Sequence, residues 1–151
     1  MKIAVFAGSF DPITKGHEDL VRRACGLFDR IVVAIGTNSD KRCMFDVEQR
    51  LKWIRQTFAD LPEVGTACYS GLTTDFCKEV GAQYMLRGIR NANDLAYEQQ
   101  IADINRRVAP EIETVMLLTR PELADVSSSA VRELLRYGKS VAELVPTCLD
   151  V

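Results

Sequence analysis

The stretch from Gly8 to His17, GSFDPITKGH, combines residue types that can bind a phosphate group. Gly8 lets the backbone turn tightly and approach a ligand, so that nearby N–H groups can contact phosphate oxygens. Ser9 adds a hydroxyl donor. His17, the only histidine of the chain, follows at the expected start of a helix, where the positive end of the helix dipole favours an anion. The alternative is an ordinary turn with a surface histidine, since neither G-x-G-x-x-G nor the P-loop pattern is present.

Two further loops carry cationic residues behind apolar runs. Lys41 and Arg42 form either an anion contact or a solvated basic loop. Arg87 ends another apolar run and Arg90 follows it closely. A guanidinium group binds phosphate in a bidentate manner, but either arginine could instead pair with a carboxylate such as Glu98.

Three consecutive serines, Ser127–Ser129, open an expected helix. One serine is enough for a helix N-cap, so the run is either an ordinary cap or a set of hydroxyl and N–H donors for an anion. Each of the four segments is weak evidence by itself. All four follow apolar runs, however, and the carboxyl ends of parallel strands meet at one edge of a sheet. The sequence therefore predicts one crevice that binds anions.

Five short apolar runs alternate with helical patterns and predict the architecture that positions these loops. The predicted strands are residues 2–7, 30–36, 64–69, 83–87 and 113–118. Their nearly continuous apolar character is typical of strands covered on both faces of a parallel sheet. We therefore expect an α/β, Rossmann-like, doubly wound fold, in which a five-stranded parallel sheet with helices on both faces forms a single domain over residues 1–151.

Helical patterns lie between these runs. Asp46, followed three residues later by Gln49, resembles a capping box, and a later helix begins near Ser127–Ser129 and ends at Gly138. A short last helix is expected over residues 140–146. Three helices each place their apolar residues on one face: Leu20, Val21, Ala24 and Phe28; Val47, Leu51, Ile54 and Phe58; Tyr97, Ile101, Ile104 and Val108.

The composition narrows the classes of protein. A formal net charge of -2 and a pI of about 5.5 argue against DNA or RNA as the main partner. The five cysteines are an odd number without a C-x-x-C pair, which indicates free thiols in a reducing compartment, so we expect a cytoplasmic protein. No signal peptide and no membrane-spanning run are expected, and a single histidine does not favour a zinc site.

The order and spacing of these segments resemble one known family. Residues 8–17 are similar to the (T/H)xGH signature of the nucleotidyltransferase superfamily, and residues 126–132 to its second signature, ISSSxx(K/R). Between them, residues 87–90 with Tyr97-Glu98 resemble the RGLR and YE elements of the phosphopantetheine adenylyltransferases. Residues 41–50 are similar to that family's KKPxFxxEER loop. The resemblance spans nearly the whole chain.

The resemblance implies transfer of AMP from ATP to 4′-phosphopantetheine, which gives dephospho-coenzyme A and pyrophosphate in coenzyme A biosynthesis. It also implies Mg²⁺ carried by the ATP phosphates, a homohexamer, and feedback inhibition by coenzyme A. By resemblance, His17 is the catalytic residue and stabilises charge at the α-phosphate. The residues implied to bind ATP are Ser9, Phe10, His17, Gly88, Ile89, Arg90, Glu98, Leu123, Ala124, Asp125, Val126, Ser127, Ser128 and Ser129. Those implied to bind phosphopantetheine are Ser9, Lys41, Thr73 and Arg87.

The chain departs from the family pattern at residues 123–126, where members commonly carry an aromatic-Ser-Phe-Ile run, and at Cys43, which replaces a proline. Other nucleotidyltransferases remain as alternatives. A nicotinate-mononucleotide adenylyltransferase shares both signatures, usually in a longer chain without the RGIR–YE combination, and a cytidylyltransferase shares the first. A non-catalytic nucleotide-binding sensor is the alternative of a different class, because a fold alone does not fix a function.

Overall fold

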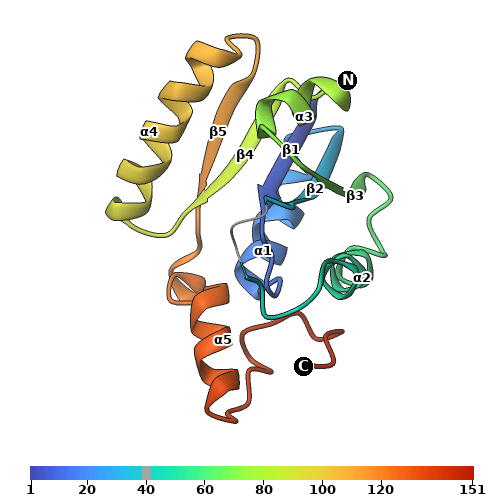
Figure 1. Ribbon diagram of the computed structural model, residues 1–151, viewed down its shortest axis with the longest axis vertical. Coiled ribbons are helices and arrows are strands. Elements are labelled where there is room, and N and C mark those ends of the chain that lie inside the picture. Colours follow the sequence, from blue (N-terminus) through green and yellow to red (C-terminus); the bar gives the residue numbers. More distant parts are fainter. Residues whose placement is uncertain (39–41) are drawn as a thin grey trace.

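The computed structural model describes residues 1–38 and 42–151 and contains a five-stranded parallel sheet flanked by helices (Figure 1). The strand order is β3-β2-β1-β4-β5. The strands are β1 (Ile3–Gly8), β2 (Arg30–Gly36), β3 (Val64–Tyr69), β4 (Tyr84–Ile89) and β5 (Glu113–Leu118). The predicted doubly wound α/β fold is confirmed. β2, β3 and β5 have the predicted bounds, whereas β1 and β4 end one and two residues later than predicted.

Helices cover both faces of the sheet. The helices are α1 (Lys15–Ala24), α2 (Val47–Thr57), α3 (Thr73–Glu79), α4 (Ala92–Val108), the 3₁₀ turn η1 (Pro121–Leu123) and α5 (Ser128–Arg136). Successive residues of a strand point to opposite faces. Ala4 and Phe6 accordingly pack in one cluster with residues of α1 and α2, while Val5 and Ala7 pack in a second cluster with Phe76 of α3.

One helix, α3, was not predicted, and one predicted helix is absent. No pattern indicated α3, because this helix has only seven residues and its N-cap residue makes no side-chain cap bond. The predicted last helix over residues 140–146 is absent, and the segment forms a turn in which Leu144 N–H donates to the Val141 carbonyl at 2.8 Å. The Leu144 carbonyl accepts from Lys15 N–H at 2.9 Å, so this segment caps α1 and is not a helix of its own.

The apolar stripe of α4 lies in an unexpected place. Tyr97, Ile104 and Val108 are 64%, 60% and 51% exposed, while the buried residues of this helix are Glu98 and Ala102. The face of α4 that packs on the sheet is therefore short of apolar side chains, and the apolar face points away from the sheet. No helix of the described residues is both long enough and apolar enough to cross a membrane.

β1 and β4 are neighbours at the point of the sheet where the strand order reverses, and they separate toward their carboxyl ends. β1 pairs with β2 on one side over six residues, but it pairs with β4 on the other side only at Ala4–Tyr84 and Val5–Met85. Beyond Val5 and Met85 the two strands are no longer paired, and this opening is the switch point at which ligands bind in doubly wound sheets. α5 lies beyond these carboxyl ends (Figure 1). It ends as predicted at Gly138, whose φ is 68° and whose N–H donates to Leu135.

Candidate active site

Two adjoining cavities open at the carboxyl ends of β1 and β4. The first has a volume of about 390 Å³ and the second about 480 Å³. Both are lined by Ala7, Gly8, Ser9 and Arg87, so these residues form their common wall. The geometry therefore offers two neighbouring ligand positions on either side of the gap between the strands.

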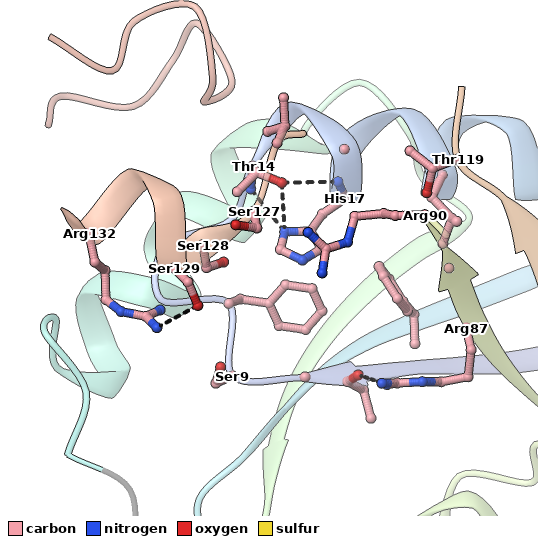
Figure 2. A pocket seen from close by; sticks show the side chains of 18 residues that line it. Ser9, Thr14, His17, Arg87, Arg90, Thr119, Ser127, Ser128, Ser129 and Arg132 are labelled. Carbon is pink, nitrogen blue, oxygen red and sulfur yellow. Dashed lines mark hydrogen bonds between the residues drawn. The ribbon is translucent and has the colours of Figure 1, made fainter. Parts of the chain in front are cut away.

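The first cavity brings together most of the residues that the sequence pointed to for ATP. Those that line it are Ser9, Phe10, His17, Gly88, Arg90, Val126, Ser127, Ser128 and Ser129 (Figure 2). Ile89 lies in the core with 4% exposure, and Leu123, Ala124 and Asp125 do not line the cavity. Glu98 lines the second cavity, where it meets Arg87. Some of the residues predicted to bind ATP therefore line the first cavity, and the others lie outside it.

The ring of His17 is fixed by the start of its own helix. Thr14 is the N-cap of α1, and its hydroxyl accepts from the His17 N–H at 3.3 Å. In return, Nδ1 of His17 accepts from the Thr14 N–H at 2.9 Å, which completes a capping box (Figure 2). Because Nδ1 accepts a hydrogen bond, the neutral ring carries its proton on Nε2. The edge-on contact with Phe10, at 4.9 Å between ring centroids, further restrains the ring.

The surroundings keep His17 neutral. Burial, together with the positive charges of Arg87 and Arg90, lowers the pKa of His17 from 6.5 to about 4, and burial is the largest cause. At pH 7 the side chain is therefore an uncharged imidazole that can donate one hydrogen bond through Nε2. It cannot act as a general base through Nε2 in this tautomer, since that nitrogen already holds the proton.

The three serines at the start of α5 have different partners. Ser127 is the N-cap and accepts from the Ala130 N–H at 3.1 Å, as in an ordinary cap. The Ser128 hydroxyl donates to the Pro12 carbonyl at 2.7 Å, and the Ser129 hydroxyl accepts from Arg132 at 3.2 Å. The cap explains only one serine, and the other two join α5 to the turn after β1 and to a cation on the cavity wall.

Arg87 bridges the gap between the separated strands. Its Nη1 donates to the Ala7 carbonyl of β1 at 2.6 Å. Its Nε and Nη2 each donate to one carboxylate oxygen of Glu98 at 2.7 Å, and Glu98 is only 7% exposed. The carboxylate pairing that the sequence left open is thus present. Since a guanidinium has five N–H groups, two remain without a partner in the described part of the chain.

The second cavity has a mixed lining that suits a long ligand. Thr73 lies at the start of α3, and its hydroxyl is 2.6 Å from the Tyr69 hydroxyl. Apolar residues such as Leu72, Met85 and Ile101 share the wall with polar ones. Lys41, the remaining residue predicted for phosphopantetheine, lies outside the described residues.

Several residues of this region were given no role of their own in the sequence analysis, although Thr14 and Arg132 belong to the two signatures. Arg132 lines the first cavity and donates to the Asp11 carbonyl at 2.9 Å, and Thr14 fixes His17. Tyr69 and Asn105 line the second cavity. The capping-box spacing of Thr14 and His17 was a usable signal, because the N-cap residue and the residue three positions later form such a pair. Tyr69 gave no signal, since only the folded chain brings it to the cavity, whereas Asn105 belongs to the part of the chain that resembles the family but was given no role of its own.

The donors in the first cavity suit phosphate oxygens. Hydroxyl, guanidinium and imidazole groups line it, and its described lining contains no carboxylate. Among the described residues, no group of three or more His, Cys, Asp or Glu side chains is placed to hold a metal ion. A divalent cation such as Mg²⁺ prefers carboxylate and phosphate oxygens, so a ligand's own phosphates suit it better than this wall.

Comparison with known proteins gives consistent results. A family model described as cytidylyltransferase-like matches residues 5–134. The phosphopantetheine adenylyltransferase of Flavobacterium psychrophilum is 46% identical over 151 residues, which cover 100% of this chain and 99% of the relative. The enzyme of the same name from Flavobacterium johnsoniae is 48% identical with the same coverage. That from Porphyromonas gingivalis is 45% identical over 95% of this chain and 94% of its own.

A solved structure shares the fold. It is a bifunctional NMN adenylyltransferase/ADP ribose pyrophosphatase from Francisella tularensis, with a TM-score of 0.73 and 17% sequence identity. The match covers 95% of this chain but only 44% of that longer protein. At this identity the likeness supports the architecture alone.

We expect the single histidine to titrate far below its ordinary range. Proton NMR of the folded protein should give a midpoint for His17 near the pKa of about 4, and long-range ¹H–¹⁵N spectra should show the proton on Nε2. In urea the same signal should titrate near 6.5. Because the unfolded chain then binds this proton at a higher pH than the folded chain, His17 should reduce stability as the pH falls from 6.5 toward 4. A folded-state midpoint near 6.5 would contradict the assignment.

Proposed function

Because the chain belongs to the cytidylyltransferase-like family, and within it to the phosphopantetheine adenylyltransferases, we propose that it transfers AMP from ATP to 4′-phosphopantetheine. The products are dephospho-coenzyme A and pyrophosphate, so the reaction belongs to coenzyme A biosynthesis. The single observation that supports this most is the common wall of the two cavities, formed by Ala7, Gly8, Ser9 and Arg87. The nucleotide in the first cavity and the pantetheine arm in the second would bring their phosphates together at this wall.

The chemistry needs positioning more than proton transfer. A phosphate oxygen of phosphopantetheine attacks the α-phosphorus of ATP, a new P–O bond forms, and the bond to the pyrophosphate group breaks. The attacking group is already an anion, so no general base has to remove a proton. The neutral, Nε2-protonated His17 fits this requirement, because it can donate to an α-phosphate oxygen as negative charge builds there.

The cations of the crevice offset the repulsion between two anionic substrates. Arg87 has two N–H groups left for the phosphopantetheine phosphate, and its pairing with Glu98 holds it in position. By family resemblance, Lys41 adds a second cation and Thr73 contacts the pantetheine arm. Ser129, Arg132 and Arg90 are available to the β- and γ-phosphates of ATP. We propose that Mg²⁺ enters on those phosphates and adds Lewis-acid stabilisation of their charge.

Three further properties are part of the proposal. Coenzyme A carries the same pantetheine arm as the substrate, so it can compete for the second cavity and act as a feedback inhibitor. All five cysteines are free, which supports a reducing, cytoplasmic location. The family resemblance implies a homohexamer, and the exposed apolar face of α4, formed by Tyr97, Ile104 and Val108, supports an interface between subunits, because exposed apolar patches often mark interaction sites.

The activity can be tested by release of pyrophosphate. The protein with Mg-ATP and 4′-phosphopantetheine should release one pyrophosphate for each dephospho-coenzyme A formed, because the bond broken is the one between the α- and β-phosphates. Nicotinate mononucleotide serves as the control acceptor. Release with nicotinate mononucleotide alone would contradict the proposal, and tight ATP binding without turnover on either acceptor would indicate a sensor.

Two substitutions of His17 should separate its roles. His17→Ala removes the Nε2 donor and should lower kcat by about two to three orders of magnitude, while the KM for ATP changes little. His17→Gln should keep the capping box through Oε1 and offer its amide N–H₂ to the phosphate, so we expect kcat within about tenfold of the wild type. Equal losses in both variants would show that the imidazole does more than donate. Unchanged kcat in His17→Ala would exclude a catalytic role.

The proposed assembly can be tested at α4. Sedimentation velocity of the wild type should give a particle of about six times the 16.9 kDa chain mass. Ile104→Asp places a charge on the exposed apolar face and should yield a smaller species, whereas Gln99→Asp, at another exposed position of the same helix, should not. A wild type that sediments as a monomer would refute the assembly.

A further inference from the structure

Arg50 is a buried cation next to the first cavity that the chemistry above does not use. It lies in the first half of α2 and is only 7% exposed. Its Nε donates to the Phe45 carbonyl at 2.9 Å, and its Nη1 donates to the Ser9 carbonyl at 2.7 Å. In the described ranges, no carboxylate oxygen lies within 4.0 Å of its guanidinium. Burying a cation without an anion is costly, so a compensating role is expected.

Arg50 holds the carbonyl of the peptide bond between Ser9 and Phe10. The backbone of Phe10, on the other side of this bond, is strained. Phe10 has a φ of 47°, in the left-handed region that residues other than glycine seldom adopt. Its ring is 2% exposed and packs against Phe6 and His17. In a trans peptide the carbonyl and the following N–H point in opposite directions. Holding the Ser9 carbonyl on Arg50 therefore turns the Phe10 N–H away from α2.

That N–H is available to a ligand. It has no acceptor among the residues that the structure describes, although Phe10 is buried against the cavity wall. Because Phe10 lines the first cavity, a ligand bound there can supply the acceptor that this N–H lacks among the described residues. Arg132 and Ser128 hold the carbonyls of Asp11 and Pro12 in the same turn, at 2.9 and 2.7 Å. The turn is thus tied to the scaffold by its carbonyls.

We propose that Arg50 is a positioning residue for the transfer reaction. By holding the Ser9 carbonyl, it aims the backbone N–H of Phe10, a residue that the family resemblance already implies to bind ATP, toward the nucleotide phosphates in the first cavity. The inference rests on the proposed function. Arg50 acts through the peptide and does not contact the nucleotide. Its planar fork holds the carbonyls of Ser9 and Phe45 at once, which a single lysine ammonium does not reproduce.

The chain allows a direct measurement, because Ser9–Phe10 is its only Ser–Phe dipeptide. Protein labelled with ¹³C at serine carbonyls and ¹⁵N at phenylalanine therefore gives one HNCO cross-peak, that of the Phe10 N–H. In the wild type, titration with Mg-ATP should move this peak in step with the binding that calorimetry measures. A peak that stays in place while ATP binds would overturn the inference.

Substitutions of Arg50 give the second readout. Arg50→Met should weaken ATP binding about tenfold and leave the Phe10 peak unresponsive, because the aimed donor is lost. Arg50→Lys keeps the charge but not the fork, and should resemble Arg50→Met. Arg55→Met, an exposed arginine of the same helix, should behave as the wild type and serves as the control. A merely structural role would lower the melting temperature and leave the Phe10 response intact, which would overturn the proposal.

The positioning role of Arg50 and the proposed transfer reaction can be refuted separately. If Arg50→Met loses its native spectrum, Arg50→Lys decides, since a normal Phe10 response in that variant would mean that charge alone suffices and aiming is unnecessary. If the wild type binds ATP and moves the Phe10 peak but releases no pyrophosphate, the proposed reaction is refuted while the positioning role for nucleotide binding is supported.

Discussion

The separation of β1 from β4 is the constraint on which the site depends. The two strands pair at only two positions, and the Arg87 side chain supplies a hydrogen bond to Ala7 across the gap. The buried carboxylate of Glu98 on α4 pairs with this guanidinium and offsets the cost of placing its charge at the opening. One arrangement therefore contains the opening between β1 and β4, the Arg87 side chain and α4. This arrangement divides the crevice into two cavities.

Contacts that begin helices also determine the chemistry. The capping box of α1 is a local backbone feature, but with histidine at its third position it selects the tautomer of the only imidazole of the sequence. At α5, likewise, Ser127 caps the helix, and Ser128 joins the helix to the turn after β1. The residues that meet these local backbone requirements also line the first cavity, so we expect substitutions here to affect stability and ligand binding together.

Most of the architecture could be predicted from the sequence because buried parallel strands carry continuous apolar runs, and motifs after the strands located the crevice. Prediction failed where packing overrides pattern. The apolar stripe of α4 indicated an inward face, yet Glu98 and Ala102 face the sheet, since Arg87 requires a carboxylate there. The segment near Leu144 resembled a helix but serves α1. Partners far apart in sequence, such as Arg50 and Ser9, leave no periodic signal.

The Leu144 carbonyl accepts from the Lys15 N–H and so joins the start of α1 to a segment far later in the chain. The histidine helix and the turn before it precede, in the order of synthesis, residues 126–132 and Leu144, which complete the cavity and the cap. Contacts of such long sequence separation carry a large loop-closure entropy, which slows folding. The residues around His17 are therefore synthesised before the segment that completes the first cavity, so the whole cavity and the capped start of α1 exist only once both segments are present.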